Sequence, residues 1–252
     1  MIEIRDLTLG YPKGPPVLKD FSLSIGAGEV VNILGPNGCG KTTLLKALLR
    51  FLPSPPGHIF LDGRPLERIK RRDLAGCLAY VPQQHHGVFP YPALEVVLMG
   101  RTAPSPWLKF SARDRERAVE ALERVRLGHL GARSYLEMSA GQRQLVLIAR
   151  ALAQDCAALV MDEPVSGLDY GNQSRLLDLI GELAAAGPAI ILTTHHPEQA
   201  VHLGGRAVLM ADGRLVDDGP ARTLITLKRV RALYGLAEKA DKAWCICKLA
   251  AS

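Results

Sequence analysis

A glycine-rich segment that ends in lysine and threonine constrains this chain more than any other feature. Residues 35–42 read GPNGCGKT and fit the pattern GxxxxGK[S/T]. An apolar run at 30–34 precedes the segment, and leucines at helical spacing follow it through 42–52, so we expect a buried strand, a loop and a helix. Glycines let such a loop curl until consecutive N–H groups point inward at phosphate oxygens. The segment therefore predicts a nucleotide site.

Eight positions in and just after this loop are the candidate nucleotide ligands. They are Gly35, Asn37, Gly38, Cys39, Gly40, Lys41, Thr42 and Thr43. We expect Lys41 to reach the β- and γ-phosphates and the Thr42 hydroxyl to hold Mg²⁺, with Thr43 as a further phosphate donor. Cys39 is expected to serve mainly as a small residue whose thiol lies close to the bound phosphate.

Two adjacent carboxylates follow a second apolar segment. Residues 157–161 have strand composition and run directly into Asp162 and Glu163. Acids often cap buried strands, but beside a phosphate loop Asp162 is placed to ligate or orient Mg²⁺. Glu163 projects differently and can accept a proton from the water that attacks the γ-phosphate. We therefore expect hydrolysis of the nucleotide rather than binding alone.

Strand and helix patterns along the chain predict an α/β fold. Alternating apolar residues in 2–25 are typical of strands around a turn, and residues 189–194 return to strand composition. Between 90 and 155 the pattern is helical instead. Separate helix-like stretches are expected at 95–99, 112–125 and 142–153. With 48% hydrophobic residues in a chain of 252, a sizeable core is available, so we expect a parallel α/β core with an inserted helical lobe.

Composition narrows the class of protein. No apolar run approaches the roughly 18–20 residues that span a bilayer, and residues 1–6 carry acids where a secretory leader needs a basic start. We therefore expect a chain kept inside the cell without a span of its own. Its five cysteines are odd in number and mostly far apart, which argues against a disulfide framework. Cys245 and Cys247 form a lone CxC, for which two thiols near a chain end are a simpler interpretation than a metal site.

The charge balance is mildly basic. Lysine and arginine number 31 against 25 acidic residues, a formal net charge of +6, which is compatible with a nucleic-acid partner, an acidic membrane surface or solubility alone. Most of the excess falls in residues 226–252, which contain six basic and two acidic residues. We interpret this tail as a solvated terminal helix, with contact to anionic lipid headgroups as the alternative, and we expect no nucleic-acid partner.

A third motif, read with the first two, carries a family resemblance. Residues 136–144 read LEMSAGQRQ and resemble the LSGGQ signature of ABC-family ATPases. The ordered set resembles an ABC nucleotide-binding domain over residues 1–235 and implies the ABC ATPase fold. The implied parts are a P-loop NTPase core of mainly parallel sheet at about 1–88 and 156–225, an N-terminal antiparallel β subdomain within it, a helical subdomain at about 89–155, and a basic tail at 226–252.

The resemblance also assigns roles outside the phosphate loop. It implies that Tyr11 stacks on adenine, a flat contact of low entropy cost, rather than only covering a turn. Asp169, in the stretch 166–169, matches the D-loop, which crosses to a partner subunit. The signature residues implied to close over ATP bound to that partner are Ser139, Ala140, Gly141 and Gln142.

Two implied roles each have a competing neighbour. Gln83 resembles the Q-loop glutamine, which touches Mg²⁺ or the attacking water, and Gln84 is the alternative. His195 matches the switch histidine that contacts the γ-phosphate, and it fits better than His196 because it directly follows the strand. The implied catalytic set is Glu163, His195 and Gln83, and the implied Mg²⁺ set is Thr42, Gln83 and Asp162.

The signature departs from the family pattern at two positions. Met138 replaces leucine, a volume-conserving apolar change, and Ala140 replaces the first glycine. A glycine held at positive φ would penalise a Cβ by roughly 1 kcal/mol. We expect instead that the backbone at Ala140 is conventional.

Three further stretches resemble the ATPases of bacterial importers for iron–siderophore, haem, cobalamin and molybdate. They are residues 79–83, 97–101 and 194–200. The resemblance implies an ATP- and Mg²⁺-dependent homodimer under two membrane permeases, fed by a periplasmic or surface binding protein, at the cytoplasmic face of the inner membrane. Residues 83–101 would then form the groove that receives a permease loop.

Three other functions are alternatives to import. A soluble ABC ATPase acting on ribosomes or nucleic acid usually carries a second ATPase domain or a long coiled coil, and neither pattern is present. An exporter ATPase is a further alternative, though many exporters fuse the ATPase to membrane helices. A non-hydrolysing scaffold conflicts with the full set of Lys41, Asp162, Glu163 and His195. The motifs do not separate one cargo from another.

Overall fold

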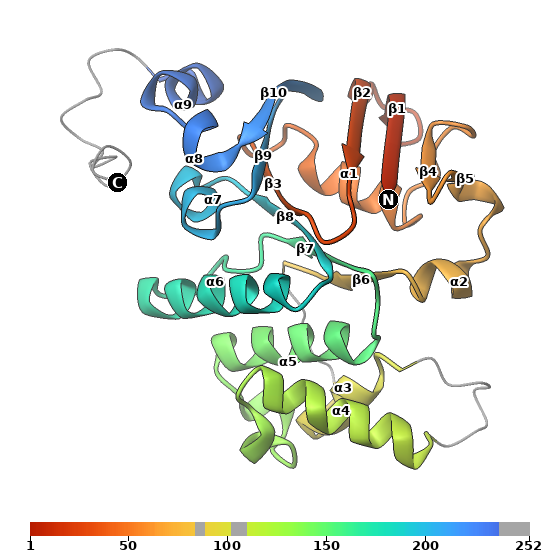
Figure 1. Ribbon diagram of the computed structural model, residues 1–252, viewed down its shortest axis with the longest axis vertical. Coiled ribbons are helices and arrows are strands. Elements are labelled where there is room, and N and C mark those ends of the chain that lie inside the picture. The colour runs from red at the N-terminus through yellow and green to blue at the C-terminus, as the bar shows by residue number, and fades with distance from the viewer. Residues whose placement is uncertain (84–88, 102–109, 237–252) are drawn as a thin grey trace.

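The computed structural model describes residues 1–83, 89–101 and 110–236, and it has the predicted α/β class. Figure 1 shows a central sheet with its helices, a small antiparallel sheet beside it, and a helical lobe below. Gln84, the pair Cys245 and Cys247, and the tail beyond residue 236 lie outside the described residues.

A six-stranded sheet forms the centre of the molecule. Its strands are, in spatial order, β10 (Arg214–Pro220), β9 (Arg206–Ala211), β3 (Val30–Leu34), β8 (Ala189–Thr194), β7 (Ala158–Asp162) and β6 (Leu78–Val81). All neighbours are parallel except β10, which runs antiparallel to β9. The strands β7 and β8 are buried over their whole length, as continuous apolar runs inside a parallel sheet should be. The residues that follow β3, β8 and β7 therefore meet at one edge of the sheet.

The N-terminal segment forms the antiparallel sheet that the family resemblance implied. Its strands are, in spatial order, β2 (Pro16–Ile25), β1 (Ile2–Gly10), β4 (Ile59–Leu61) and β5 (Arg64–Pro65). In β2 the apolar residues Phe21, Leu23 and Ile25 are buried and alternate with exposed residues, which is the period of a strand with one solvated face. The backbone N–H of Lys19 donates to the Gly213 carbonyl at 2.9 Å, so the two sheets are joined.

Helices flank the central sheet. They are α1 (Lys41–Leu48), the short η1 (Leu66–Arg68), α2 (Arg71–Ala75), α6 (Tyr170–Ala185), α7 (Pro197–Leu203), α8 (Ala221–Leu224) and α9 (Leu227–Tyr234). The helix expected through residue 52 ends earlier, at Leu48. Arg50 adopts a left-handed φ of 55°, which an α-helix cannot continue through, although Leu49 and Leu52 remain buried as the leucine spacing implied.

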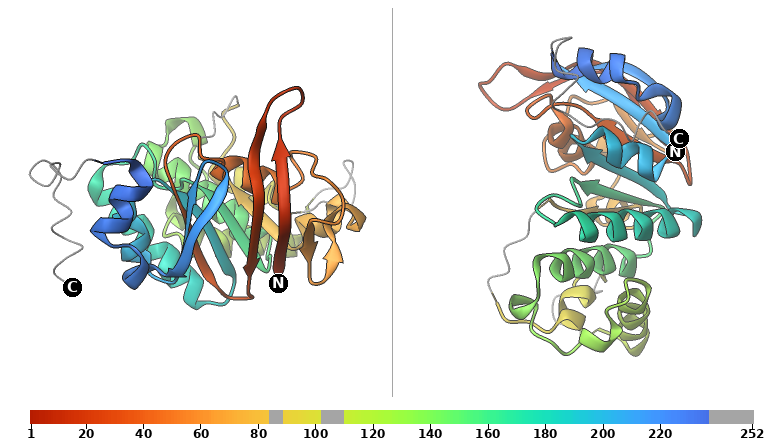
Figure 2. Two further views of the ribbon diagram at one scale, coloured as in Figure 1. Left: turned by 90° about the horizontal axis from the view of Figure 1, so that it is seen from above. Right: turned by 90° about the vertical axis from the view of Figure 1, so that its left-hand side faces the viewer.

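The inserted lobe is helical, as expected, and it packs onto the sheet. It contains α3 (Ala93–Leu98), α4 (Ala112–Arg124), η2 (Gly128–Leu130), η3 (Tyr135–Glu137) and α5 (Ala140–Ala153). Figure 2 shows these helices as a separate layer below the core. Apolar residues of α3, α4 and α5 share one buried cluster with Met161 of β7 and Leu192 of β8. The lobe is thereby held against the strands that carry the acid pair.

In the described part of the C-terminal tail, one face of α9 packs against the core, while most of the residues remain exposed. Helix α9 buries Val230 and Leu233 in a cluster with Leu34, and Arg229 Nε lies 2.7 Å from Asp217 Oδ2 on β10. Two of the charged residues of α9, Lys228 and Arg229, lie on its exposed face. Among the described residues, no helix is both long enough and apolar enough to cross a bilayer.

Candidate nucleotide site

The loop between β3 and α1 adopts a conformation that only glycine permits. Gly40, which precedes α1, has φ 108°, and a Cβ on Gly35 would approach the Met210 carbonyl oxygen to 2.1 Å. Both positions therefore require glycine. The strand, loop and helix occur in the predicted order, which places the N-terminus of α1 at the phosphate position.

Lys41 is the first residue of α1 and is 5% exposed. Its Nζ donates to the carbonyl oxygens of Gly35 at 2.8 Å and Pro36 at 3.1 Å. The same ammonium lies 3.7 Å from Glu163 Oε1. The lysine charge thus stands between the loop and the acid pair, where a phosphate would be received.

Asp162 lies at the end of β7 and is 3% exposed. Its Oδ1 accepts hydrogen bonds from Thr42 Oγ1 at 3.2 Å and from Thr193 Oγ1 at 2.6 Å. A carboxylate beside a hydroxyl is a set of hard oxygen donors, which Mg²⁺ prefers. The donor chemistry at Asp162 and Thr42 therefore fits the expected Mg²⁺.

Glu163 turns away from its neighbour because of its backbone. Its φ of 44° is left-handed, an unusual conformation for a residue with a Cβ. The Glu163 N–H donates to Thr193 Oγ1 at 3.0 Å, which fixes this turn. Asp162 and Glu163 consequently have different neighbours: Asp162 accepts from Thr42 and Thr193, while Glu163 lies beside Lys41.

Gln83 and His195, to which the family resemblance assigns catalytic roles, both lie next to the Glu163 carboxylate. Gln83 Nε2 donates to Glu163 Oε2 at 3.1 Å and lies 3.3 Å from Ser166 Oγ. His195 Nδ1 lies 3.1 Å from Glu163 Oε2, but the two atoms are not aligned as a hydrogen bond. Segments separated by 80 and 32 positions along the chain thus meet at one carboxylate.

His196 has a different partner from His195. Its Nδ1 lies 3.2 Å from Glu198 Oε1, and hydrogen bonding to Glu198 raises the pKa of His196 above its usual value. His195, by contrast, lines the cavity with Lys41 and Glu163. The geometry therefore favours His195 for the switch position.

A cavity of about 630 Å³ is bordered by Lys41, Gln83, Glu163 and His195, whereas Asp162 lies behind Thr42 and does not line it. Its lining residues are Tyr11, Val17, Asn37, Gly38, Gly40, Lys41, Thr42, Thr43, Gln83, Glu163, Ser166 and His195. Ten of these were predicted as site residues. Val17 was not predicted, since nothing in the sequence shows that β2 borders the cavity, and Ser166 was named only within the D-loop match at 166–169.

Two residues of the loop that were expected to bind nucleotide do not line this cavity. Gly35 presents its carbonyl to Lys41, and the Cys39 thiol is buried against the back of Gly35. The Cys39 N–H donates to Pro36 O at 3.3 Å, and burial raises the pKa of the thiol. In this structure both residues shape the loop.

The signature segment forms the start of α5 in the helical lobe. Ser139 caps the helix: its Oγ accepts from the Gln142 N–H at 3.2 Å, while the Ser139 N–H donates to Gln142 Oε1 at 3.1 Å. Ala140 is the first helical residue and has no positive φ, as expected for a conventional backbone. Neither these residues nor Gly141 lines the cavity.

Asp169 plays the same capping part for the neighbouring helix. Its Oδ1 accepts from the Asn172 N–H at 2.9 Å at the start of α6, and hydrogen bonding to Asn172 lowers the pKa of the Asp169 carboxyl. A Cβ on Gly141 would lie 3.8 Å from the Asn172 side chain. The signature and D-loop segments are therefore adjacent, and Asp169 too does not line the cavity.

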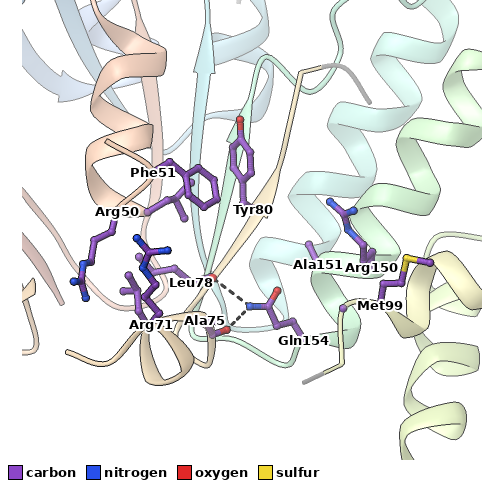
Figure 3. Close-up of a pocket in the computed structure, with 13 residues that line it drawn as sticks. Arg50, Phe51, Arg71, Ala75, Leu78, Tyr80, Met99, Arg150, Ala151 and Gln154 are labelled. Atoms are coloured by element: carbon purple, nitrogen blue, oxygen red, sulfur yellow. Dashed lines mark hydrogen bonds between the residues drawn. The ribbon is translucent and has the colours of Figure 1, made fainter. Parts of the chain in front are cut away.

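A second hollow, of about 350 Å³, lies between the core and the helical lobe (Figure 3). One wall comes from the end of α1, α2 and β6, including Arg50, Phe51 and Tyr80. The other comes from the end of α3 and from α5, including Met99 and Arg150. Gln154 joins the walls, because its Nε2 donates to the carbonyls of Ala75 and Leu78. We call this hollow the interlobe groove.

Comparison with known proteins agrees with this geometry. Residues 18–166 match the family profile described as ABC transporter. The hemin import ATP-binding protein HmuV of Hahella chejuensis is 40% identical over 226 residues, covering 86% of this chain and 86% of the relative. The molybdate import ATP-binding protein MolC of Haemophilus influenzae is 32% identical, and the match covers 93% of this chain and 88% of the relative. A solved inward-facing metal-chelate type ABC transporter superposes with a TM-score of 0.81 at 32% identity. The superposition covers 93% of this chain and 88% of the solved chain.

Proposed function

The chain belongs to the ABC transporter family as an ATP-binding subunit that hydrolyses ATP, and we propose that it energises a bacterial or archaeal importer of a metal chelate or an oxyanion. The chelates we have in view are iron–siderophore, haem and cobalamin, and the oxyanion is molybdate. Relatives named for hemin and for molybdate import support this cargo class. The observation that carries the ATPase function is the meeting of Lys41, Gln83, Glu163 and His195 in one cavity.

In this proposal each residue of the cavity has one task. Lys41 holds the β- and γ-phosphates, and Tyr11, which is 44% exposed at the cavity rim, stacks on adenine. Glu163 accepts the proton of the attacking water. His195 contacts the γ-phosphate.

Mg²⁺ would be held by Asp162, Thr42 and Gln83. The Thr42 hydroxyl already touches the Asp162 carboxylate at 3.2 Å, and Gln83 reaches the same cavity. When bound, the cation neutralises charge on the phosphates. Thr193 supports the site from behind by donating to Asp162.

The working form is a homodimer in this proposal. The cavity contains the phosphate loop and Glu163 but none of the signature residues. Ser139 and the free N–H groups at the start of α5 form a phosphate-binding helix end. A second copy, arranged head to tail, would supply this end to each cavity, so that two copies complete two sites.

The interlobe groove is the proposed seat of a permease loop. It is lined by exposed apolar side chains, among them Phe51 at 63% and Met99 at 52% exposure. Tyr80 lines it from β6, which ends at Val81, two residues before Gln83 in the cavity. Burial, followed by the charge of Asp162, raises the pKa of Tyr80 to about 12.

The proposed location follows from this partner. The chain would sit at the cytoplasmic face of the inner membrane, attached through two permease subunits that receive cargo from a periplasmic or surface binding protein. We expect no nucleic-acid partner.

The test starts from the adjacent reading frames, where we expect a multi-span permease, and continues with co-expression of that permease and this chain. We expect the chain in the membrane fraction with the permease and in the supernatant without it. Reconstituted vesicles should take up haem, a ferric siderophore, cobalamin or molybdate only with ATP and the matching binding protein. A chain that stays in the supernatant and cosediments with ribosomes, or that drives efflux, would contradict the proposal.

A further inference from the structure

The C-terminal helix α9 contacts the residue that follows β8. The hydroxyl of Tyr234, the last residue of α9, donates a hydrogen bond of 2.8 Å to the backbone carbonyl of His195. Figure 1 shows α9 beside α8 and close to α7, far along the chain from the phosphate loop. Burial raises the pKa of the Tyr234 hydroxyl above its usual value, so near neutral pH the hydroxyl keeps the proton that it donates.

The peptide unit between His195 and His196 is held at both of its polar atoms. Tyr234 binds the carbonyl, and the His196 N–H donates to Thr194 Oγ1 at 3.0 Å. Thr194 Oγ1 in turn donates to Gln199 Oε1 at 2.6 Å. Because the His195 side chain leaves from the Cα next to this peptide unit, any tilt of the unit displaces the imidazole relative to Glu163.

Helix α9 is a firm support for this contact. Val230 and Leu233 are buried in the cluster that contains Leu34, the residue directly before the phosphate loop. The helix is capped at its start, where Thr226 Oγ1 accepts from the Arg229 N–H, and it ends at Gly235 in the left-handed conformation. The hydroxyl is therefore placed against the same body that carries the loop.

We propose that Tyr234 is a positioning residue for ATP hydrolysis, which holds the backbone of His195 so that the imidazole faces Glu163 inside the cavity. The inference rests on the proposed role of His195. Tyr234 does not line the cavity, so it acts through His195 and touches no reacting atom. The tail that charge alone marked as a solvated extension thus contributes to the hydrolytic site.

The test is the Tyr234→Phe variant of the full-length chain. The ring that packs α9 is kept and only the donor is lost. We expect kcat for ATP hydrolysis to fall about 3- to 10-fold, the net effect of one hydrogen bond, while KM for ATP and the melting temperature change little. The matched control is Thr223→Val on α8, which removes an exposed hydroxyl that donates to the Pro220 carbonyl at 3.2 Å and should leave kcat unchanged.

A double-mutant cycle separates positioning from a general structural role. In a His195→Ala background Tyr234→Phe should have no further effect on kcat, because the side chain that it positions is gone. Single-turnover hydrolysis with excess protein extends the measurement to very slow variants. This inference alone would be overturned if Tyr234→Phe left kcat unchanged while His195→Ala lowered it. It would also be overturned if the two losses in kcat multiplied in the double variant. Full turnover in His195→Ala would overturn the proposed role of His195 with it.

Discussion

Lys41 Nζ lies 3.7 Å from Glu163 Oε1, so the cation of the phosphate loop and the carboxylate after β7 face each other across the nucleotide cavity. Both side chains are mostly buried, at 5% and 12% exposure. The pair joins the two motifs that the sequence keeps 122 positions apart. Replacing either member should reveal its separate task.

Glu163→Gln should abolish turnover while ATP binding persists. The amide keeps the size of the side chain but cannot accept the proton of the attacking water, and a lost general base usually costs about 10²–10⁴-fold in rate. Steady-state phosphate release and ATP titration measure the two properties. Glu120→Gln, on the exposed face of α4, is the control. Near wild-type turnover in Glu163→Gln would exclude it from the base role.

Lys41→Ala should instead weaken nucleotide binding itself. The variant removes the charge that meets the β- and γ-phosphates, and charge-assisted contacts of this kind are worth about 1.5–3 kcal/mol, or roughly 10- to 150-fold in Kd. Calorimetric titration with ATP measures the loss, with Lys228→Ala on α9 as a control that keeps the same change in net charge. An ATP affinity equal to that of the unaltered chain would contradict the phosphate-loop assignment.

Ala140→Gly should change the ATPase rate less than threefold. Ala140 begins α5 without a positive φ, so no strain is present for glycine to relieve. The capping hydrogen bonds between Ser139 and Gln142 do not involve the Ala140 side chain. A tenfold or larger rise in rate would show that the Cβ at this position obstructs closure over ATP.

The His196–Glu198 pair should give a pH-dependent contribution to stability. Hydrogen bonding to Glu198 raises the pKa of His196 above 6.5, and hydrogen bonding to His196 lowers that of Glu198 below 4.5. The histidine part is present below pH 6.5 and is lost as pH rises through the raised pKa. The carboxylate part is present above pH 4.5 and is lost as pH falls through the lowered pKa.

The melting temperature of the unaltered chain minus that of Glu198→Gln should therefore be largest between pH 4.5 and 6.5 and should shrink toward zero near about pH 9. Thermal unfolding at several pH values measures this difference. The same subtraction for Glu120→Gln should stay flat. A difference for Glu198→Gln that grows with pH would show that the pair is not the source.

Arg150→Glu should weaken attachment to the permease. Among the described residues that line the interlobe groove none is acidic, whereas Arg50, Arg71 and Arg150 are basic, and burial lowers the pKa of Arg150. A carboxylate on the incoming loop would compensate this desolvation. We expect at least a tenfold rise in Kd, about 1.4 kcal/mol, by pull-down titration, with ATP affinity retained. Arg222→Glu on α8 is the control. If both variants bound the permease equally well, the permease would contact the chain outside the interlobe groove.

Local sequence was sufficient for much of the fold and of the site. The phosphate loop, the strand that ends in Asp162 and the helical lobe are each encoded by residues close together in the chain, because glycine placement, apolar runs and helical spacing act locally. Even the start of α5 follows this logic, since Ser139 and Gln142 are three residues apart and cap the helix between them.

Other features depend on which segments become neighbours. Thr193 supports Asp162 because β7 and β8 are paired with these two residues in register. Tyr234 reaches His195 only because the apolar face of α9 packs against Leu34. Motif order along the chain therefore indicated the chemistry of this protein, whereas the partners of each candidate catalytic group were set by packing between distant segments, which local propensity does not encode.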